Sequence, residues 1–121
     1  MAKKTKKAVE TEITLPESIS IAGEIYSIEY LDKIEFDGTN GFLFGLSVYP
    51  NRSIKVATKD LNGDPLSASQ IETTLWHEVA HMILFAGQYN KLGQNEALVE
   101  WLGRCIKDIT LSIQENGNLK F

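Results

Sequence analysis

Apolar and polar residues alternate along the first half of the chain, which predicts strands. Between residues 12 and 31 the alternation runs on either side of Ala22-Gly23-Glu24, and residues 46–56 repeat it around Pro50-Asn51-Arg52. A period of two residues interrupted by glycine or proline is typical of β-hairpins. We therefore expect two hairpins that form a small, mostly antiparallel sheet of about four strands.

The stretch between the two hairpins is harder to assign. Residues 37–45 read DGTNGFLFG, in which three glycines surround Phe42, Leu43 and Phe44. This composition predicts either a glycine-hinged loop with buried aromatic side chains or a short irregular strand. Residues 60–66, DLNGDPL, form a turn cluster that leads out of the sheet.

Helical periodicity replaces the alternation after the turn cluster. Ser67 and Gln70 have the spacing of a capping box, so a helix begins here, and Gly87 is placed to end it. Apolar residues recur along one arc of this helix, whereas His77 and His81 lie on roughly the opposite face. One face therefore suits a core and the other is free for chemistry.

A second helix follows the connector of residues 87–94. Asn95 can cap its start, and apolar residues recur at helical spacing as far as Asn116-Gly117. Glu96 and Glu100 lie one turn apart near its beginning. The fold class that we predict is α+β, a small sheet packed by these two helices.

Length and charge limit the possible functions. The chain has 121 residues, of which 43% are hydrophobic, and this suits one domain over residues 11–121 behind a disordered, lysine-rich tail at residues 1–10. The tail carries a net charge of +3, which leaves −7 on residues 11–121. Nucleic acid and anionic membrane are therefore not expected as partners. With no signal peptide or membrane span in the pattern, we expect a cytoplasmic protein, and its oligomeric state stays open.

The first helix contains the motif that indicates chemistry, His77-Glu78-Val79-Ala80-His81. Histidines at i and i+4 of a helix share a face, so both imidazoles can reach one Zn²⁺ ion. Glu78 between them is placed to act as a general base on zinc-activated water and to pass the proton to a departing amine. Both histidines of the chain fall within this motif. We predict one zinc ion per chain.

A catalytic zinc site needs a third protein ligand, with a fourth position left for water. No other histidine exists, and Cys105, the one cysteine, falls in the middle of the second helix on its packing side. The third ligand is therefore expected to be a carboxylate, which gives a His₂Glu set. Glu96 is the first candidate, with Glu100 accepting a hydrogen bond from a ligating imidazole, although the two roles could be reversed.

The start of the second helix and the overall layout both resemble known metallopeptidases. Asn95-Glu96-Ala97-Leu98-Val99-Glu100 resembles the thermolysin-type gluzincin pattern, and the whole layout is similar to compact phage and prophage metallopeptidases of the ImmA/IrrE-like, minimal zincin group. The resemblance implies a phage or bacterial intracellular zinc metallopeptidase with Glu96 as ligand and Glu100 supporting a ligating histidine. It also implies a peptide substrate bound along an edge strand, here residues 53–58.

Three points stay open at the level of sequence. Tyr89 and Tyr49 are candidates for stabilising the oxyanion of a cleaved amide, because no further histidine is present. A non-catalytic, metal-containing binding module or virion-associated module is the alternative function, since so small a chain has little room for a substrate cleft. A peptide deformylase-like amidase is disfavoured, because its third ligand is an upstream cysteine and Cys105 lies downstream of the histidines.

Overall fold

The computed structural model describes residues 15–35 and 41–116 of the chain. The predicted lysine-rich tail at residues 1–10 lies outside the described residues. The elements are, in order, β1 (Ser18–Ile21), β2 (Glu24–Leu31), β3 (Gly45–Val48), the 3₁₀ turn η2 (Tyr49–Asn51), β4 (Ser53–Ala57), α1 (Ala68–Ala86), α2 (Asn90–Gly93) and α3 (Glu96–Asn116).

Both predicted hairpins are confirmed. β1 and β2 pair antiparallel across Ala22 and Gly23, which have φ values of 52° and 86°. β3 and β4 pair antiparallel across η2 and Arg52, whose φ of 50° is left-handed. The turn residues identified in the sequence therefore lie where the chain reverses, and the left-handed conformations match the twist that tight hairpins need.

The sheet as a whole is mixed, so the prediction of a mostly antiparallel sheet is wrong. Its strand order is β1-β2-β4-β3, and β2 pairs parallel with β4. The second hairpin inserts β4 between β2 and β3, and residues Ile54, Val56 and Ala57 of β4 are at most 1% exposed. The interior position pairs the backbone of β4 on both edges, while its Ile54 and Val56 side chains join the core on one face of the sheet.

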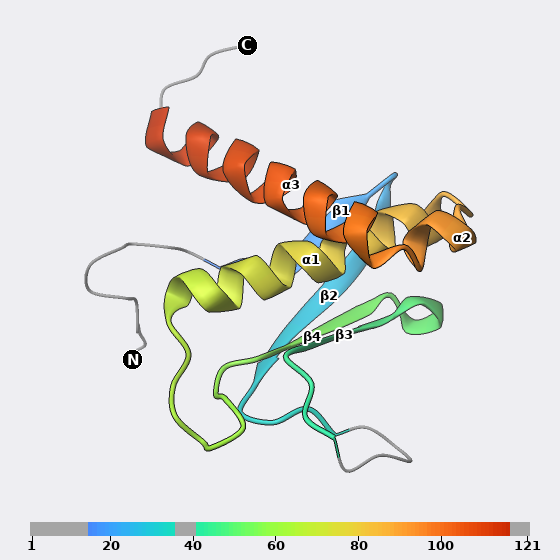
Figure 1. Cartoon of the computed structure of the whole chain (residues 1–121). Coiled ribbons are helices and arrows are strands. Elements are labelled where there is room, and N and C mark those ends of the chain that lie inside the picture. The colour runs from blue at the N-terminus through green and yellow to red at the C-terminus, as the bar shows by residue number, and fades with distance from the viewer. Residues whose placement is uncertain (1–14, 36–40, 117–121) are drawn as a thin grey trace.

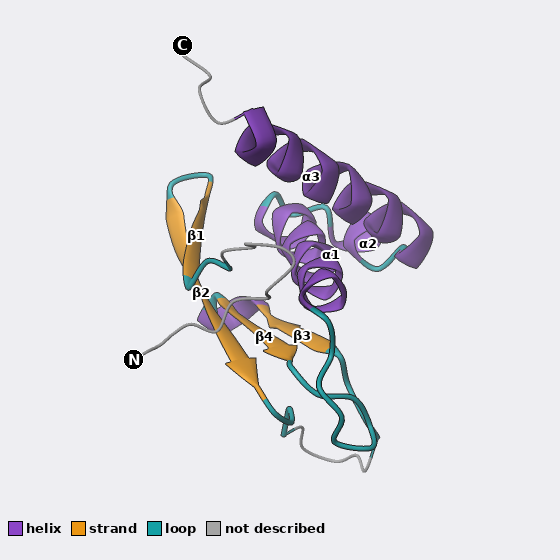
Figure 2. Cartoon of the chain, turned by 90° about the vertical axis from the view of Figure 1, so that its left-hand side faces the viewer, coloured by secondary structure: helices purple, strands orange, loops and turns teal. Residues whose placement is uncertain are grey.

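The helices form two further layers above the sheet. Figure 2 shows α1 lying between the sheet and α3, and the packing agrees, since α1 contacts β3, β4, α2 and α3. One helix therefore covers the sheet and the second helix packs on the first. The buried core between sheet and α1 consists of Tyr26, Ile28, Ile54, Val56, Leu75, Val79 and Met82.

The ends of α1 follow the sequence signals. Ser67 Oγ accepts a hydrogen bond from the backbone N–H of Gln70, the Gln70 side chain accepts one from the N–H of Ser67, and the helix ends at Gly87. The capping box fixes where α1 starts, and therefore which residues face the core. None of the helices in the described ranges is long and apolar enough to cross a lipid bilayer.

Helix α3 runs antiparallel to α1. Its beginning lies beside the middle of α1, and further along Lys107 donates hydrogen bonds to Ser69 and Thr73 at the start of α1. The two helices diverge towards the C-terminal end of α3 (Figure 1), where Ile109 and Ile113 are 60% and 50% exposed. The contact with α1 therefore extends from Glu96 as far as Lys107.

Candidate metal centre

The two histidines of α1 lie on the face of the helix that is turned away from the core. His77 and His81 are separated by one helical turn, and their ring centroids are 5.0 Å apart. Their side chains are 25% and 14% exposed, so each ring has partners on the protein side and an edge open to solvent. The α-helix brings both rings to one place because residues four apart share a face.

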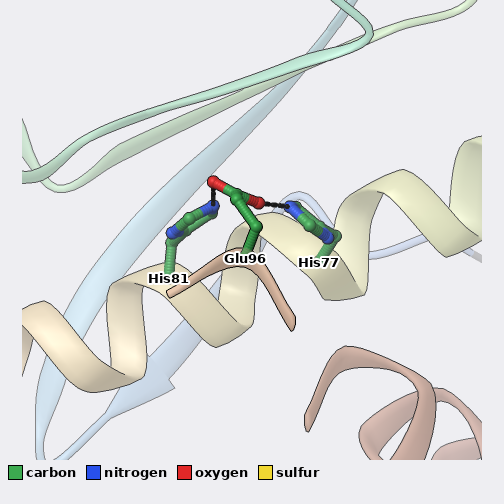
Figure 3. Close-up of side chains that lie close together, drawn as sticks. All are labelled: His77, His81 and Glu96. Carbon is green, nitrogen blue, oxygen red and sulfur yellow. Dashed lines mark ion pairs between the residues drawn. The ribbon is translucent and has the colours of Figure 1, made fainter. Parts of the chain in front are cut away.

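Glu96 reaches the histidines from the first turn of α3. One of its carboxylate oxygens lies 3.2 Å from His77 Nε2, and the other lies 3.6 Å from His81 Nε2. Figure 3 shows the carboxylate standing between the two rings, with an ion pair to each. The structure thus brings together His77, His81 and Glu96, with one ligand atom of each lying within 4.8 Å of the others.

Gly103 allows α3 to come this close. A Cβ built on Gly103 would lie 3.0 Å from His77 Cα and 3.1 Å from both the His77 nitrogen and the Trp76 carbonyl oxygen. These are backbone atoms of α1, which cannot move aside as a flexible side chain can. The absence of a side chain at Gly103 therefore sets the helix separation that places Glu96 at the histidines.

Each imidazole is held through its Nδ1 atom. His77 Nδ1 lies 3.3 Å from the carboxylate of Glu100, and His81 Nδ1 lies 2.7 Å from the backbone carbonyl oxygen of Gly93. Both of these partners only accept hydrogen bonds, so a proton on each Nδ1 would satisfy them. In the neutral tautomer the Nε2 atoms then present lone pairs towards Glu96.

In this tautomer the two Nε2 lone pairs and the Glu96 carboxylate face one another, and a metal ion between them would satisfy all three groups. In a tetrahedral site with bonds of about 2.0–2.1 Å, neighbouring ligand atoms lie about 3.3–3.4 Å apart. The separations of 3.2 and 3.6 Å end on different oxygens of Glu96, and one donor atom of each of the three residues lies within 4.8 Å of the others. The His77, His81 and Glu96 cluster could therefore hold a metal ion, and its donor types suit zinc and related divalent ions.

Glu78 lies beside the cluster and is only 8% exposed. Its Oε1 accepts a 2.6 Å hydrogen bond from Ser47 Oγ on β3, and the same hydroxyl lies 3.1 Å from the Glu78 backbone oxygen. A Cβ on Gly45 would lie 2.8 Å from Oε2 of Glu78. A side chain at Gly45 would thus crowd the second carboxylate oxygen, so the glycine keeps room around it.

Three adjoining hollows in the described part of the chain meet at His77. One, of about 390 Å³, is lined by Ser47, Glu78, His81 and Glu96 among others. A second, of about 410 Å³, extends past Phe42 and Phe44, and a third, of about 360 Å³, extends between α1 and α3. The three candidate ligands, a buried carboxylate and open space therefore share one side of the molecule.

The expected edge strand at residues 53–58 is a wrong prediction. β4 (Ser53–Ala57) has β2 on one side and β3 on the other, so its backbone groups are already paired. The edge of the sheet next to α1 is β3, which pairs with β4 alone among the residues that the structure describes. Alternating hydrophobicity predicts a strand, whereas its neighbours in the sheet depend on how the hairpins assemble.

Other sequence candidates are not part of the cluster. Tyr49 and Tyr89 are 40% and 59% exposed, and neither lines the three hollows described above. Cys105 is a free, half-buried thiol outside the core. Conversely, the sequence did not single out Ser47 or the carbonyl of Gly93, because a serine in a strand and a backbone oxygen carry no distinctive local signal.

Comparison with known proteins gives no further guide to the site, since no protein-family model, curated protein or solved structure matches this chain.

Proposed function

We propose that this protein is a zinc-dependent peptidase, in which His77, His81 and Glu96 hold the metal and Glu78 acts as general base. The proposal depends on one observation: three candidate ligands lie together, and a buried carboxylate lies beside them. A purely structural metal site has a use for the three ligands, but it has none for a buried carboxylate held beside them by Ser47.

The proposed ligand roles follow from which imidazole nitrogen each carboxylate approaches. Glu96 approaches the Nε2 atoms of both histidines, whereas Glu100 approaches only Nδ1 of His77. We therefore assign Glu96 as the third ligand. Glu100 and the Gly93 carbonyl hold the imidazole rings in the orientation and tautomer that metal binding requires.

A zinc ion bound there would act as a Lewis acid and lower the pKa of a coordinated water to about 7. Glu78 lines the same hollow as the three ligands, so its carboxylate can accept the proton of the attacking water. It then delivers that proton to the nitrogen of the leaving amine. Ser47 orients the carboxylate for both transfers through its hydrogen bond to Oε1.

We further propose that a peptide substrate lies along β3. Within residues 15–35 and 41–116 no strand pairs with the outer edge of β3, so its backbone groups there can accept an added strand, and β3 contacts α1 beside Glu78. A peptide paired there would run past Glu78 and His77. This places the edge strand of the proposal at Gly45–Val48 instead of residues 53–58.

Metal content is the first test. Protein purified without chelator and loaded with zinc should contain about one zinc ion per chain by mass spectrometry. His77→Ala and Glu96→Ala should lose it, whereas Glu115→Ala, at an exposed position on α3, should retain it. Wild-type protein that takes up no zinc would exclude the proposed centre.

Activity then separates an enzyme from the alternative, a non-catalytic metal module. Glu78→Gln should keep the zinc and lose hydrolysis of peptides from a degenerate library, because an amide cannot take up the proton. Full zinc content with no Glu78-dependent cleavage would favour the binding module. Undiminished cleavage by Glu78→Gln would remove Glu78 from the mechanism.

A further inference from the structure

The hollow between α1 and α3 begins at the metal centre and ends at two cations. It has a volume of about 360 Å³ and is lined by Thr73, His77, Glu100, Gly103, Arg104, Lys107 and Asp108. His77 and Glu100 belong to the proposed metal centre, whereas Arg104 and Lys107 have no part in it. A substrate that occupies the hollow at His77 can therefore extend towards these two side chains.

Lys107 is fixed in place without neutralisation of its charge. Its Nζ donates hydrogen bonds to Thr73 Oγ1 at 2.6 Å, to Ser69 Oγ at 3.1 Å and to the Ser69 carbonyl oxygen at 3.4 Å. All three acceptors are neutral groups, and the three ammonium protons are used. Lys107 therefore contributes a positive potential to the hollow and makes no ion pair among the described residues.

Arg104 supplies the free hydrogen-bond donors. It lies one turn before Lys107 on α3, is exposed, and makes no ion pair within the described residues. A guanidinium group presents five N–H donors in a fork that fits a carboxylate. Asp108 lies at the same hollow and opposes this potential, but neither cation pairs with it.

We infer that the Arg104 and Lys107 end of the hollow between α1 and α3 is a subsite that binds a carboxylate of the substrate. This inference rests on the proposed peptidase function and adds a substrate class to it. The carboxylate belongs either to an Asp or Glu side chain or to the C-terminus of the peptide. Both sources present the same group to a guanidinium.

The helix geometry sets how far this carboxylate lies from the cleaved bond. Along α3, Arg104 is about 6 Å and Lys107 about 10 Å beyond Glu100, at 1.5 Å of rise per residue. Glu100 itself contacts His77. An extended peptide covers about 3.3–3.6 Å per residue, so the carboxylate is expected about two or three residues from the scissile bond.

The test uses zinc-loaded, full-length protein and a peptide set with one position varied at a time. Glu, Gln and Lys are compared two and three residues to either side of an apolar residue, and each peptide is made with a free and an amidated C-terminus. Products are counted by mass spectrometry, and cleavage that persists in Glu78→Gln is subtracted. We expect Glu to exceed Gln by about fivefold in kcat/KM, the factor of a partly solvated ion pair.

Variants of the hollow identify the residues responsible. Arg104→Glu should reverse the preference from Glu to Lys, Arg104→Lys should retain part of it, and Asp108→Asn should increase it. Lys91→Gln, which removes a cation from α2 outside this hollow, is the matched control and should change nothing. If the cleavage rate falls only when the C-terminus is amidated, the bound carboxylate is that of the peptide end. If the rate depends on an internal Glu, the bound carboxylate is that of a side chain.

Two outcomes separate this inference from the proposed function. Glu78-dependent cleavage with equal rates for Glu, Gln and Lys would overturn the carboxylate subsite and leave the peptidase intact. If no peptide is cleaved, binding of fluorescent Glu and Gln peptides to the zinc-loaded protein is measured by anisotropy. Tighter binding of the Glu peptide that is lost in Arg104→Gln supports the subsite without activity, and equal binding overturns it.

Discussion

Ser47 Oγ donates a 2.6 Å hydrogen bond to Oε1 of Glu78, which joins the edge strand β3 to the middle of α1 across 31 residues of sequence. The contact gives the buried carboxylate a fixed orientation next to His77 and His81. A buried carboxylate would be costly without such a hydrogen-bond partner. The strand therefore contributes a side chain to the candidate site as well as to the sheet.

Ser47→Ala should reduce hydrolysis without removing zinc. Loss of a hydrogen bond to a charged group costs about 1.5–3 kcal/mol, which corresponds to about a 10- to 100-fold fall in kcat/KM if it acts fully on the transition state. The measurements are steady-state kinetics over a range of pH together with zinc content. Ser47→Thr, which keeps a hydroxyl, should restore activity, and Ser20→Ala on the exposed face of β1 should have no effect. A rate unchanged in Ser47→Ala would contradict a positioning role.

Glu100→Ala should weaken zinc binding by about 10- to 100-fold, the usual effect of removing a carboxylate that holds a ligating histidine. The reason is that His77 Nδ1 loses the acceptor 3.3 Å away and the ring is no longer oriented. Affinity is measured by competition with a chromophoric chelator. Glu115→Ala removes the same group from an exposed position of α3 and serves as the control. Equal affinity in the two variants would mean that Glu100 does not hold the ring.

Gly103→Ala should lower both stability and zinc affinity. An alanine in a helix interior normally raises the free energy of unfolding by about 0.5–1 kcal/mol relative to glycine. A lower free energy of unfolding would therefore indicate a steric conflict between the helices. Here the new Cβ would lie 3.0–3.1 Å from backbone atoms of His77 and Trp76 and would push α3 away from α1. Overpacking of this kind costs about 1–3 kcal/mol. Thermal unfolding and chelator competition measure both effects, with Ser112→Ala as an exposed control on α3. A more stable Gly103→Ala protein would show that the helices tolerate the extra carbon.

Tyr30 should make the fold sensitive to alkali. Burial raises the pKa of its phenol above the usual value near 10, with further contributions from Glu17 and Glu72, and its hydroxyl donates a 2.6 Å hydrogen bond to the Pro16 carbonyl. A raised folded pKa means that the contribution of the neutral phenol is fully present below about pH 10 and is lost as the pH rises through the folded value.

Urea unfolding at a series of pH values tests this expectation. The free energy of unfolding of the wild type should fall above about pH 10. Tyr30→Phe should be less stable near neutrality by about 0.5–1.5 kcal/mol, because the hydrogen bond to Pro16 is lost. Its decline in alkali should be shallower, since phenylalanine does not ionise. Parallel declines in the two proteins would show that Tyr30 is not responsible.

Local signals in the sequence were sufficient for most of the secondary structure. The hairpin turns at Gly23 and Arg52 and the capping box at Ser67 each depend on residues within a few positions of one another, and the structure confirms all three. Asn95 also caps α3, since its side chain accepts a hydrogen bond from the Leu98 N–H. The short helix α2 (Asn90–Gly93) was missed, because a single turn leaves no periodic pattern to detect.

By itself the sequence determined that His77 and His81 lie one turn apart on a shared face, because hydrogen bonds within a helix fix the geometry of residues four apart. It also reduced the remaining ligand to Glu96 or Glu100. Tertiary structure decided which of them meets both Nε2 atoms, that Ser47 holds Glu78, and that β4 is interior while β3 forms the edge. These relationships join segments far apart in the chain, and their distances depend on how the whole core packs and on the close helix approach that Gly103 allows.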